Sequence, residues 1–103
     1  MTRLVVSGAS GQFGRKAVEL LLERVVPADL VLVTRSPDRL ADLAANGVEV
    51  RYGDFDEPGS LASAFAGGDR LLLISTLSVG RRAEQHGRAI DAARASGIAR
   101  IVY

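Results

Sequence analysis

Residues 4–14 decide the fold of this chain, and they read Leu-Val-Val-Ser-Gly-Ala-Ser-Gly-Gln-Phe-Gly. An apolar run at 4–6 leads into glycines at positions 8, 11 and 14, and a long amphipathic stretch follows at once. This pattern is typical of a strand that turns sharply into a helix, whose free backbone N–H groups can hold a phosphate. The stretch therefore predicts a dinucleotide-binding loop.

Each of the three glycines has an expected task in such a loop. Gly8 would allow the tight exit from the strand, Gly11 would let the backbone approach the pyrophosphate, and Gly14 would let the helix lie close to the sheet. The same spacing also fits a turn that serves close packing alone, without a ligand. Further phosphate-facing groups are expected from the side chains of Ser10 and Gln12 and from the backbone N–H of Phe13.

The rest of the chain alternates between short apolar runs and amphipathic stretches. This alternation indicates parallel strands joined by right-handed crossovers, with helices on both faces of the sheet. Pro27 is expected to end the first helix, and Ser36 and Asp56 to cap the second and third. We expect strands at 4–6, 30–33, 48–52, 71–74 and 98–103, and helices at about 11–24, between Ser36 and Asn46, between Asp56 and Gly67, and at about 81–96.

The predicted fold is α/β, a Rossmann-like doubly wound parallel sheet with strand order 3-2-1-4-5 and helices on both faces. The third run alternates polar and apolar residues, which favours an edge position, whereas the first and fourth runs are apolar enough for the centre of the sheet. Ligands of such open sheets bind at the switch point, here at the carboxyl ends of the first and fourth strands.

The end of the second strand bears on which dinucleotide is bound. An NAD-preferring domain usually carries an acid here for the ribose 2′-OH, but this chain has Arg35, whose planar guanidinium suits a 2′-phosphate. Ser36 could add a hydroxyl and Arg39 a second positive charge. Alternatively, these arginines are solvated surface charges near Asp38 and Asp42. We expect NADP(H) to be preferred over NAD(H).

Polar residues after the third and fourth strands complete the expected site. Asp54 lies beside the expected adenine pocket, where it could accept from the adenine amino group, with Phe55 contributing backbone or apolar contact. An Asx turn at Asp54 is an alternative that involves no ligand. Ser75 and Thr76 follow the fourth strand and should approach the ribose on the nicotinamide side.

No residue is assigned as a catalytic acid or base, so the catalytic residues are unknown at this stage. His86, the only histidine, has the spacing of a helix face turned towards the sheet and is expected to be a packing residue rather than a catalyst. Lys16, the only lysine, belongs to the first helix and cannot act at the strand ends. Two acids near residue 54, without a histidine or further carboxylates nearby, do not predict a metal site.

Composition excludes several classes of function. The 103 residues fit one small domain, and the net charge of +1, from 13 basic and 12 acidic residues, argues against nucleic acid or an anionic membrane as the main partner. The chain has no cysteine, which rules out disulfides and thiolate chemistry. No apolar run approaches the length of a membrane span, and we expect a cytoplasmic protein.

Taken together, the motifs resemble those of NmrA-like atypical short-chain dehydrogenases/reductases. Four of them lie at 8–14, 34–37, 52–54 and 71–76. The stretch 78–86, followed by 90–93, is similar to the NADPH-dependent quinone oxidoreductase branch in particular. The resemblance covers essentially the whole chain.

The resemblance implies an NADPH-binding Rossmann domain that reduces a quinone-like small molecule by hydride transfer. It places the pyrophosphate on Ser10, Gln12 and Phe13. It places the 2′-phosphate on Arg35, and the nicotinamide ribose on Ser75 and Thr76. Family members are much longer, so residues 1–103 are expected to be the NAD(P)-binding N-terminal portion of a longer protein, without its substrate lobe. The family also contains non-enzymatic dinucleotide sensors, which remain the alternative function. The oligomeric state stays open, a dimer included.

Overall fold

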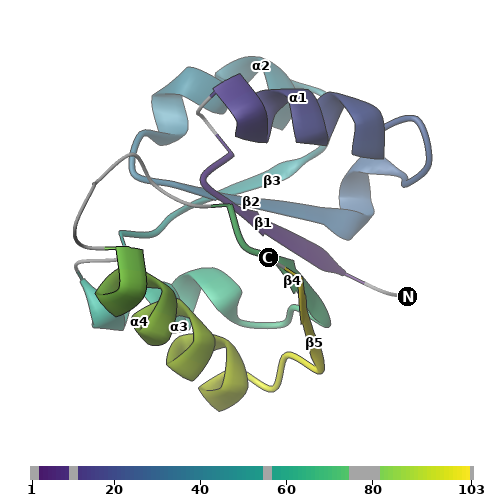
Figure 1. Cartoon of the computed structure of the whole chain (residues 1–103). Coiled ribbons are helices and arrows are strands. Elements are labelled where there is room, and N and C mark those ends of the chain that lie inside the picture. Colours follow the sequence, from purple (N-terminus) through teal and green to yellow (C-terminus); the bar gives the residue numbers. More distant parts are fainter. Residues whose placement is uncertain (1–2, 10–11, 55–56, 75–81, 103) are drawn as a thin grey trace.

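The computed structural model describes residues 3–9, 12–54, 57–74 and 82–102, which form a five-stranded parallel sheet flanked by helices (Figure 1). The strand order is β3-β2-β1-β4-β5, which confirms the predicted Rossmann-like arrangement. The strands are β1 (Leu4–Ser7), β2 (Leu30–Thr34), β3 (Glu49–Tyr52), β4 (Arg70–Leu72) and β5 (Arg100–Val102). The α-helices are α1 (Gln12–Leu21), α2 (Ala41–Ala45), α3 (Pro58–Phe65) and α4 (Arg82–Ala95), and two 3-10 helices are η1 (Pro27–Asp29) and η2 (Pro37–Leu40).

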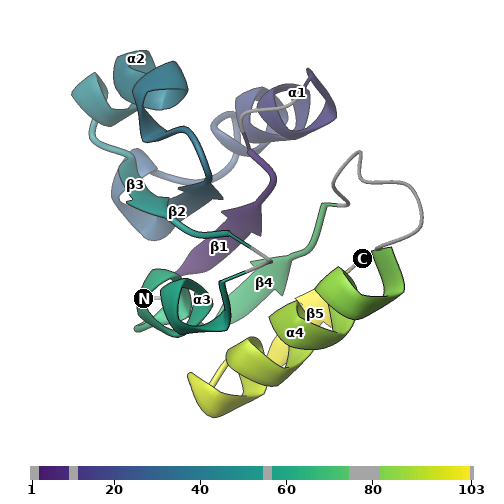
Figure 2. The same ribbon diagram turned by 90° about the vertical axis from the view of Figure 1, so that its left-hand side faces the viewer.

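The helices cover the sheet on both faces, as predicted. Helices α1 and α2 lie on one face, and α3 and α4 lie side by side on the other (Figures 1 and 2). Successive strand residues point to opposite faces, so Val5 joins the core beneath α3 and α4 while Val6 joins the core beneath α1 and α2. Within the described ranges no helix is both long and apolar enough to span a membrane.

Strand β3 lies at the edge that its alternating sequence predicts, and its polar face contacts α3. Glu49 and Arg51 pair in register with Val31 and Val33, whose side chains belong to the core beneath α3 and α4. The Arg51 guanidinium donates to the carbonyl oxygens of Ala64 (2.9 Å) and Ala66 (2.6 Å) at the end of α3. These last carbonyls of a helix lack intrahelical partners, so Arg51 ties the sheet edge to the helix.

A three-residue ionic chain extends from Arg51 along the same edge. Glu49 accepts from Arg51 and also from Arg3, whose Nη2 lies 2.9 Å from the Glu49 Oε1 atom. Both arginines lower the pKa of the Glu49 carboxyl, because their hydrogen bonds favour its charged form. The chain therefore connects the start of β1 with β3 and α3.

The first helix and its connection to β2 differ from the prediction. Helix α1 ends at Leu21 rather than near Arg24, and the chain continues in turns in which the Arg24 and Val25 N–H groups both donate to the Leu21 carbonyl at 2.9 Å. Pro27 does not end the helix but begins η1, where its fixed φ and missing N–H are tolerated.

The second predicted helix is divided in two, and Ser36 does not cap it. Residues 37–40 form η2 and residues 41–45 form α2. The Ser36 side chain makes no capping hydrogen bond, and its backbone N–H donates to the Thr34 hydroxyl at 3.0 Å instead. Helix α3 begins at Pro58 with Glu57 at the N-cap position, while Asp56 lies outside the described residues.

Candidate functional site

The carboxyl ends of the strands meet at one edge of the sheet, where the chain leaves β1 towards one face and β4 towards the other (Figure 1). Strand β1 is followed by α1, which covers one face, and β4 precedes α4, which covers the opposite face. This divergence creates the switch point at which open α/β sheets bind ligands. The predicted site residues that the structure describes come from segments that follow strands at this edge.

Gly8 has the backbone conformation, and Gly14 the close packing, that the glycine spacing predicts. Gly8 has φ 68°, which favours glycine, and a Cβ added there would lie 3.0 Å from the Ile74 carbonyl oxygen. A Cβ on Gly14 would lie 2.1 Å from the Gly8 carbonyl oxygen and 2.8 Å from the Ala9 Cα. The first turn of α1 therefore packs directly on the backbone that leaves β1.

The structure describes only part of the glycine loop. Ser10 and Gly11 lie outside the described residues. The backbones of Gln12 and Phe13 form the start of α1, but their side chains are not described. The helix that the sequence predicts from about residue 11 is present and begins at Gln12. The first N–H groups of a helix have no partner within the helix itself.

A buried serine, which the sequence reasoning did not single out, holds β1 and β4 together where they begin to separate. The regular pairing of these strands ends at Val6 and Leu72. Beyond it, the Ser7 hydroxyl accepts from the Ile74 N–H at 3.3 Å and lies 3.5 Å from the Leu72 carbonyl oxygen. The sequence does contain a sign of this role, because Ser7 is a short polar residue at the end of an otherwise apolar strand.

Main-chain hydrogen bonds join the end of β2 to the glycine loop on one side and to the residue after β3 on the other. The Ala9 N–H donates to the Val33 carbonyl at 3.5 Å, and the Gly53 N–H donates to the Thr34 carbonyl at 3.0 Å. Thr34 is buried, and its hydroxyl accepts the Ser36 N–H. These bonds fix the backbone on both sides of Arg35.

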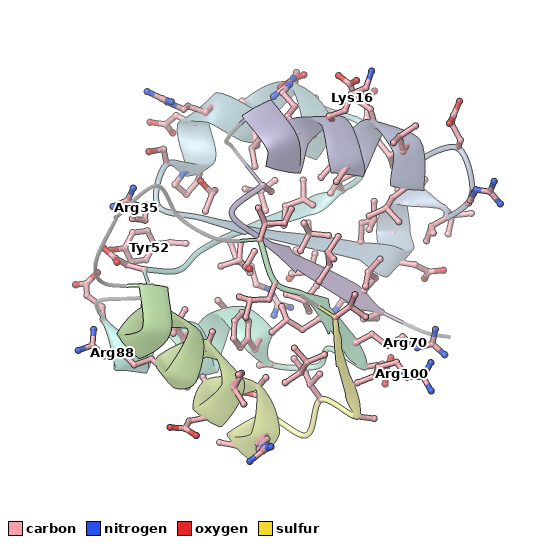
Figure 3. All side chains as sticks on the ribbon, in the orientation of Figure 1. Lys16, Arg35, Tyr52, Arg70, Arg88 and Arg100 are labelled. Carbon is pink, nitrogen blue, oxygen red and sulfur yellow. The ribbon has the colours of Figure 1, made fainter. Side chains whose placement is uncertain are left out.

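Arg35 is exposed at the carboxyl edge, where the sequence places it (Figure 3), and the next residue, Ser36, is exposed as well. Within the described residues the Arg35 guanidinium makes no hydrogen bond or ion pair. Asp42, one of the two acids that the sequence places near Arg35 along the chain, is paired with Arg15 of α1. Arg15 also donates to the Arg39 carbonyl at 3.2 Å, so it fastens the segment after β2 to α1.

The loop after β3 is held in a tight turn. The Glu57 N–H donates to the Asp54 carbonyl at 2.9 Å, and the Asp54 N–H donates to the Ser60 hydroxyl at 2.9 Å. The same hydroxyl donates to the Glu57 carbonyl at 2.7 Å. Asp54 is half-buried at the expected position beside β3, whereas Phe55 lies outside the described residues.

Tyr52 is a second residue that the sequence reasoning did not place in the site. It is the last residue of β3, its side chain is 46% exposed, and its hydroxyl donates to the Glu57 carboxylate. This bond raises the pKa of the Tyr52 hydroxyl because the negative carboxylate favours the neutral phenol, while the nearby Arg35 charge opposes the rise. Figure 3 shows Arg35 and Tyr52 on the same side of the molecule.

Among the residues that the structure describes, we assign no catalytic residue. Ser75 and Thr76 follow Ile74 but lie outside the described residues, as does the side chain of His86 in α4. Lys16 is exposed on α1 and points away from the sheet (Figure 3). Among the described residues, no group of three or more histidines and carboxylates lies close enough to hold a metal ion.

Comparison with known proteins gives matches over almost the whole chain. A model of the NAD(P)H-binding family matches residues 8–103. Quinone oxidoreductase 2 of Escherichia coli strain K12 is 40% identical over 100 residues, which cover 97% of this chain and 35% of that protein. An NmrA-like family domain-containing oxidoreductase of Aspergillus flavus is 27% identical over 105 residues, which cover 98% of this chain and 34% of that protein.

Two solved structures resemble the fold in detail. The NADPH-dependent quinone oxidoreductase of Escherichia coli, complexed with NADPH, has a TM-score of 0.90 and 40% identity over 95% of this chain and 35% of that chain. The triphenylmethane reductase of Citrobacter sp., complexed with NADP(H), has a TM-score of 0.91 and 36% identity over 96% of this chain and 35% of that chain.

These matches confirm the resemblance to NmrA-like reductases and to quinone oxidoreductases. The present chain spans only 34% or 35% of the length of each of these relatives. The part that it spans contains the glycine loop and the five-stranded sheet described above. By its sequence, and by a fold that agrees with it, the chain belongs to the NAD(P)H-binding family.

Proposed function

We propose that this chain is the NADP(H)-binding domain of an oxidoreductase that transfers hydride from NADPH to a quinone-like small molecule. Residues 1–103 would form the dinucleotide-binding domain, and a substrate lobe would belong to the rest of a longer protein. The observation that carries the proposal is the close packing of Gly14 on Gly8 at the switch point, which places the start of α1 directly behind the loop. The similarity to a quinone oxidoreductase supports the choice of acceptor.

The pyrophosphate is proposed to lie on the loop between β1 and α1. The N-terminus of α1 offers N–H groups that have no partner within the helix and the positive end of the helix dipole, both of which favour a diphosphate. Gly8 and Gly14 hold the backbone in the required shape. The residues assigned to this subsite are Gly8, Ser10, Gly11, Gln12, Phe13 and Gly14.

The adenosine end is proposed to lie over the ends of β2 and β3. Arg35 would bind the 2′-phosphate through its guanidinium, with Ser36 as a further donor, because Arg35 is exposed and Asp42 is already paired with Arg15. Asp54 and Phe55 would contact the adenine. This assignment predicts a preference for NADP(H) over NAD(H).

The nicotinamide end is proposed to lie beyond β4, with Ser75 and Thr76 at its ribose. The bound cofactor would supply the hydride, so the part of the protein present here needs to bind and orient it. The Ser7 hydroxyl fixes the end of β4 against β1 and so determines where this segment begins. Catalytic groups that act on the acceptor are not assigned within residues 1–103.

Side-by-side calorimetric titration with NADPH and NADH tests the proposal. We expect binding of both, with NADPH tighter by about tenfold or more, since a charge-assisted pair with Arg35 contributes about 1.5–3 kcal/mol. The absence of affinity for any adenine dinucleotide in folded protein would refute the proposed function.

Turnover by the full-length protein tests the oxidoreductase part of the proposal. We expect loss of NADPH absorbance on addition of a simple quinone. Tight cofactor binding without turnover of any quinone would instead favour the non-enzymatic dinucleotide sensor.

A further inference from the structure

The aromatic ring of Tyr52 is exposed at the carboxyl edge of the sheet, and Tyr52 belongs to neither hydrophobic core cluster. The described residues include four large hydrophobic side chains that are exposed, and Tyr52 is the aromatic one among them. The other three are Leu20, Val26 and Val102. Tyr52 differs from them by its place, because it ends β3 beside the segment that carries Arg35.

The ring is held in position although it is exposed. Its hydroxyl donates to the carboxylate of Glu57, and the Glu57 backbone is itself fixed by the turn to Asp54 and by the Ser60 hydroxyl. An exposed side chain that is already ordered loses less conformational entropy when a ligand packs on it. Tyr52 is therefore a preorganised flat surface rather than a freely rotating side chain.

The ring also lies one strand away from the proposed 2′-phosphate site. Tyr52 pairs in register with Thr34, the residue before Arg35, and neighbouring strands are about 4.8 Å apart. The Arg35 charge acts on the Tyr52 hydroxyl, in agreement with their common side in Figure 3. A nucleotide whose 2′-phosphate lies on Arg35 would bring its base within reach of the phenol ring.

We propose that the Tyr52 ring is the surface on which the adenine base packs when the adenosine 2′-phosphate lies on Arg35, with Glu57 as the positioning residue that holds the ring. This inference rests on the proposed function and extends it by two residues. Stacking of a base on an aromatic side chain depends on the π-face of the ring, so the hydroxyl itself contributes through orientation.

The composition of the chain allows this contact to be observed directly. Residues 1–103 contain no tryptophan and two tyrosines, Tyr52 and Tyr103, so in a polypeptide of these 103 residues Tyr103→Phe leaves Tyr52 as the only tyrosine and the main intrinsic fluorophore. The probe is adenosine 2′,5′-bisphosphate, which carries the base and the 2′-phosphate but lacks the nicotinamide that would itself absorb tyrosine emission. We expect saturable quenching of the Tyr52 emission, with a midpoint equal to the calorimetric Kd.

Affinity of the variants provides a second measurement. Tyr52→Ala should weaken binding of the bisphosphate and of NADPH by about tenfold, the effect of losing one base–aromatic stack, while Tyr52→Phe should stay within about threefold. Tyr52→Leu repeats the test if the alanine variant does not fold. Leu20→Ala, which removes a similarly exposed apolar side chain on α1, is the matched control and should bind like the parent.

The outcomes separate this inference from the proposed function. Calorimetric binding of the bisphosphate without a change in Tyr52 emission, together with unchanged affinity of Tyr52→Ala and Tyr52→Leu, would overturn the role of the ring and leave the NADP(H) site intact. Failure of folded parent protein to bind either ligand would overturn both proposals.

Discussion

Arg35 is the residue on which discrimination between the two dinucleotides depends. Its guanidinium is exposed, the backbone on either side is fixed by the Thr34 hydrogen bonds, and Asp42 is engaged by Arg15. A guanidinium on a fixed backbone, without an ion-pair partner among the described residues, can meet a phosphate with little reorganisation of the main chain.

Replacement of Arg35 by glutamate should therefore affect the two cofactors unequally. Arg35→Glu is expected to weaken NADPH by about tenfold to a hundredfold, because a charge-assisted hydrogen bond is lost and a like charge is added, and to change NADH much less. The matched control is Arg70→Glu, which makes the same change of charge at the start of β4, away from the carboxyl ends of the strands (Figure 3). Equal losses for NADPH and NADH by titration would contradict the 2′-phosphate role.

Gly14 sets the distance between α1 and the strand that precedes it. A methyl group there would overlap the Gly8 carbonyl oxygen, which is a backbone atom and cannot rotate away. The helix would have to shift, and the loop would shift with it.

We expect Gly14→Ala to lower the free energy of unfolding by about 1–3 kcal/mol, the range for overpacking a core, and to weaken both dinucleotides. Gly87→Ala is the control, because a Cβ at this exposed position of α4 meets nothing within 4 Å. That variant should gain about 0.5–1 kcal/mol from helix propensity. Denaturation curves showing the same stability for both variants would refute this account of the loop.

At the scale of elements, the ionic chain of Arg3, Glu49 and Arg51 joins β1, β3 and α3. The pKa of Glu49 is lowered in the folded protein, so its contribution to stability is present above the unfolded value, near 4.5, and is lost as the pH falls towards the folded value. The Glu49 side chain is 43% exposed, so solvent screening keeps this contribution below about 1 kcal/mol.

Glu49→Gln should therefore lower the melting temperature slightly near neutral pH, and the difference from the parent should shrink as the pH falls below about 4.5. Thermal melts of both proteins over a series of acid buffers measure this difference. Glu19→Gln on the exposed surface of α1 is the control for loss of a surface charge. A difference that grows towards acid pH would have the wrong sign for a lowered pKa.

The elements themselves could be predicted largely from the sequence, because burial on both faces makes β1 and β2 continuously apolar and the edge strand alternating. Local pattern did not reveal that α1 ends at Leu21 or that residues 37–45 divide into η2 and α2. In the site, the glycines and Arg35 follow a spacing that can be read along the chain. The roles of Ser7 and Arg15 cannot be read from such a spacing, because their hydrogen bonds join residues that are 65 and 27 positions apart in the sequence.

At the scale of the whole molecule, cofactor binding and folding should be linked. A ligand that binds only the native state stabilises it by about 2.7 kcal/mol at about a hundredfold excess over its Kd. We expect NADPH to raise the melting temperature by several degrees or more, measured by circular dichroism, and Gly11→Val to abolish the shift. An unchanged melting temperature at saturating NADPH would count against a native-state site.

The two borders of the sheet differ in what they can accept. At β3 the inward-facing Glu49 and Arg51 are already bonded to each other and to the end of α3, a pattern that discourages a further strand from pairing there. At β5, Val102 is 51% exposed, and no described strand pairs along the outer side. We therefore expect any growth of the sheet, whether by additional chain or by association with a neighbour, on the β5 side.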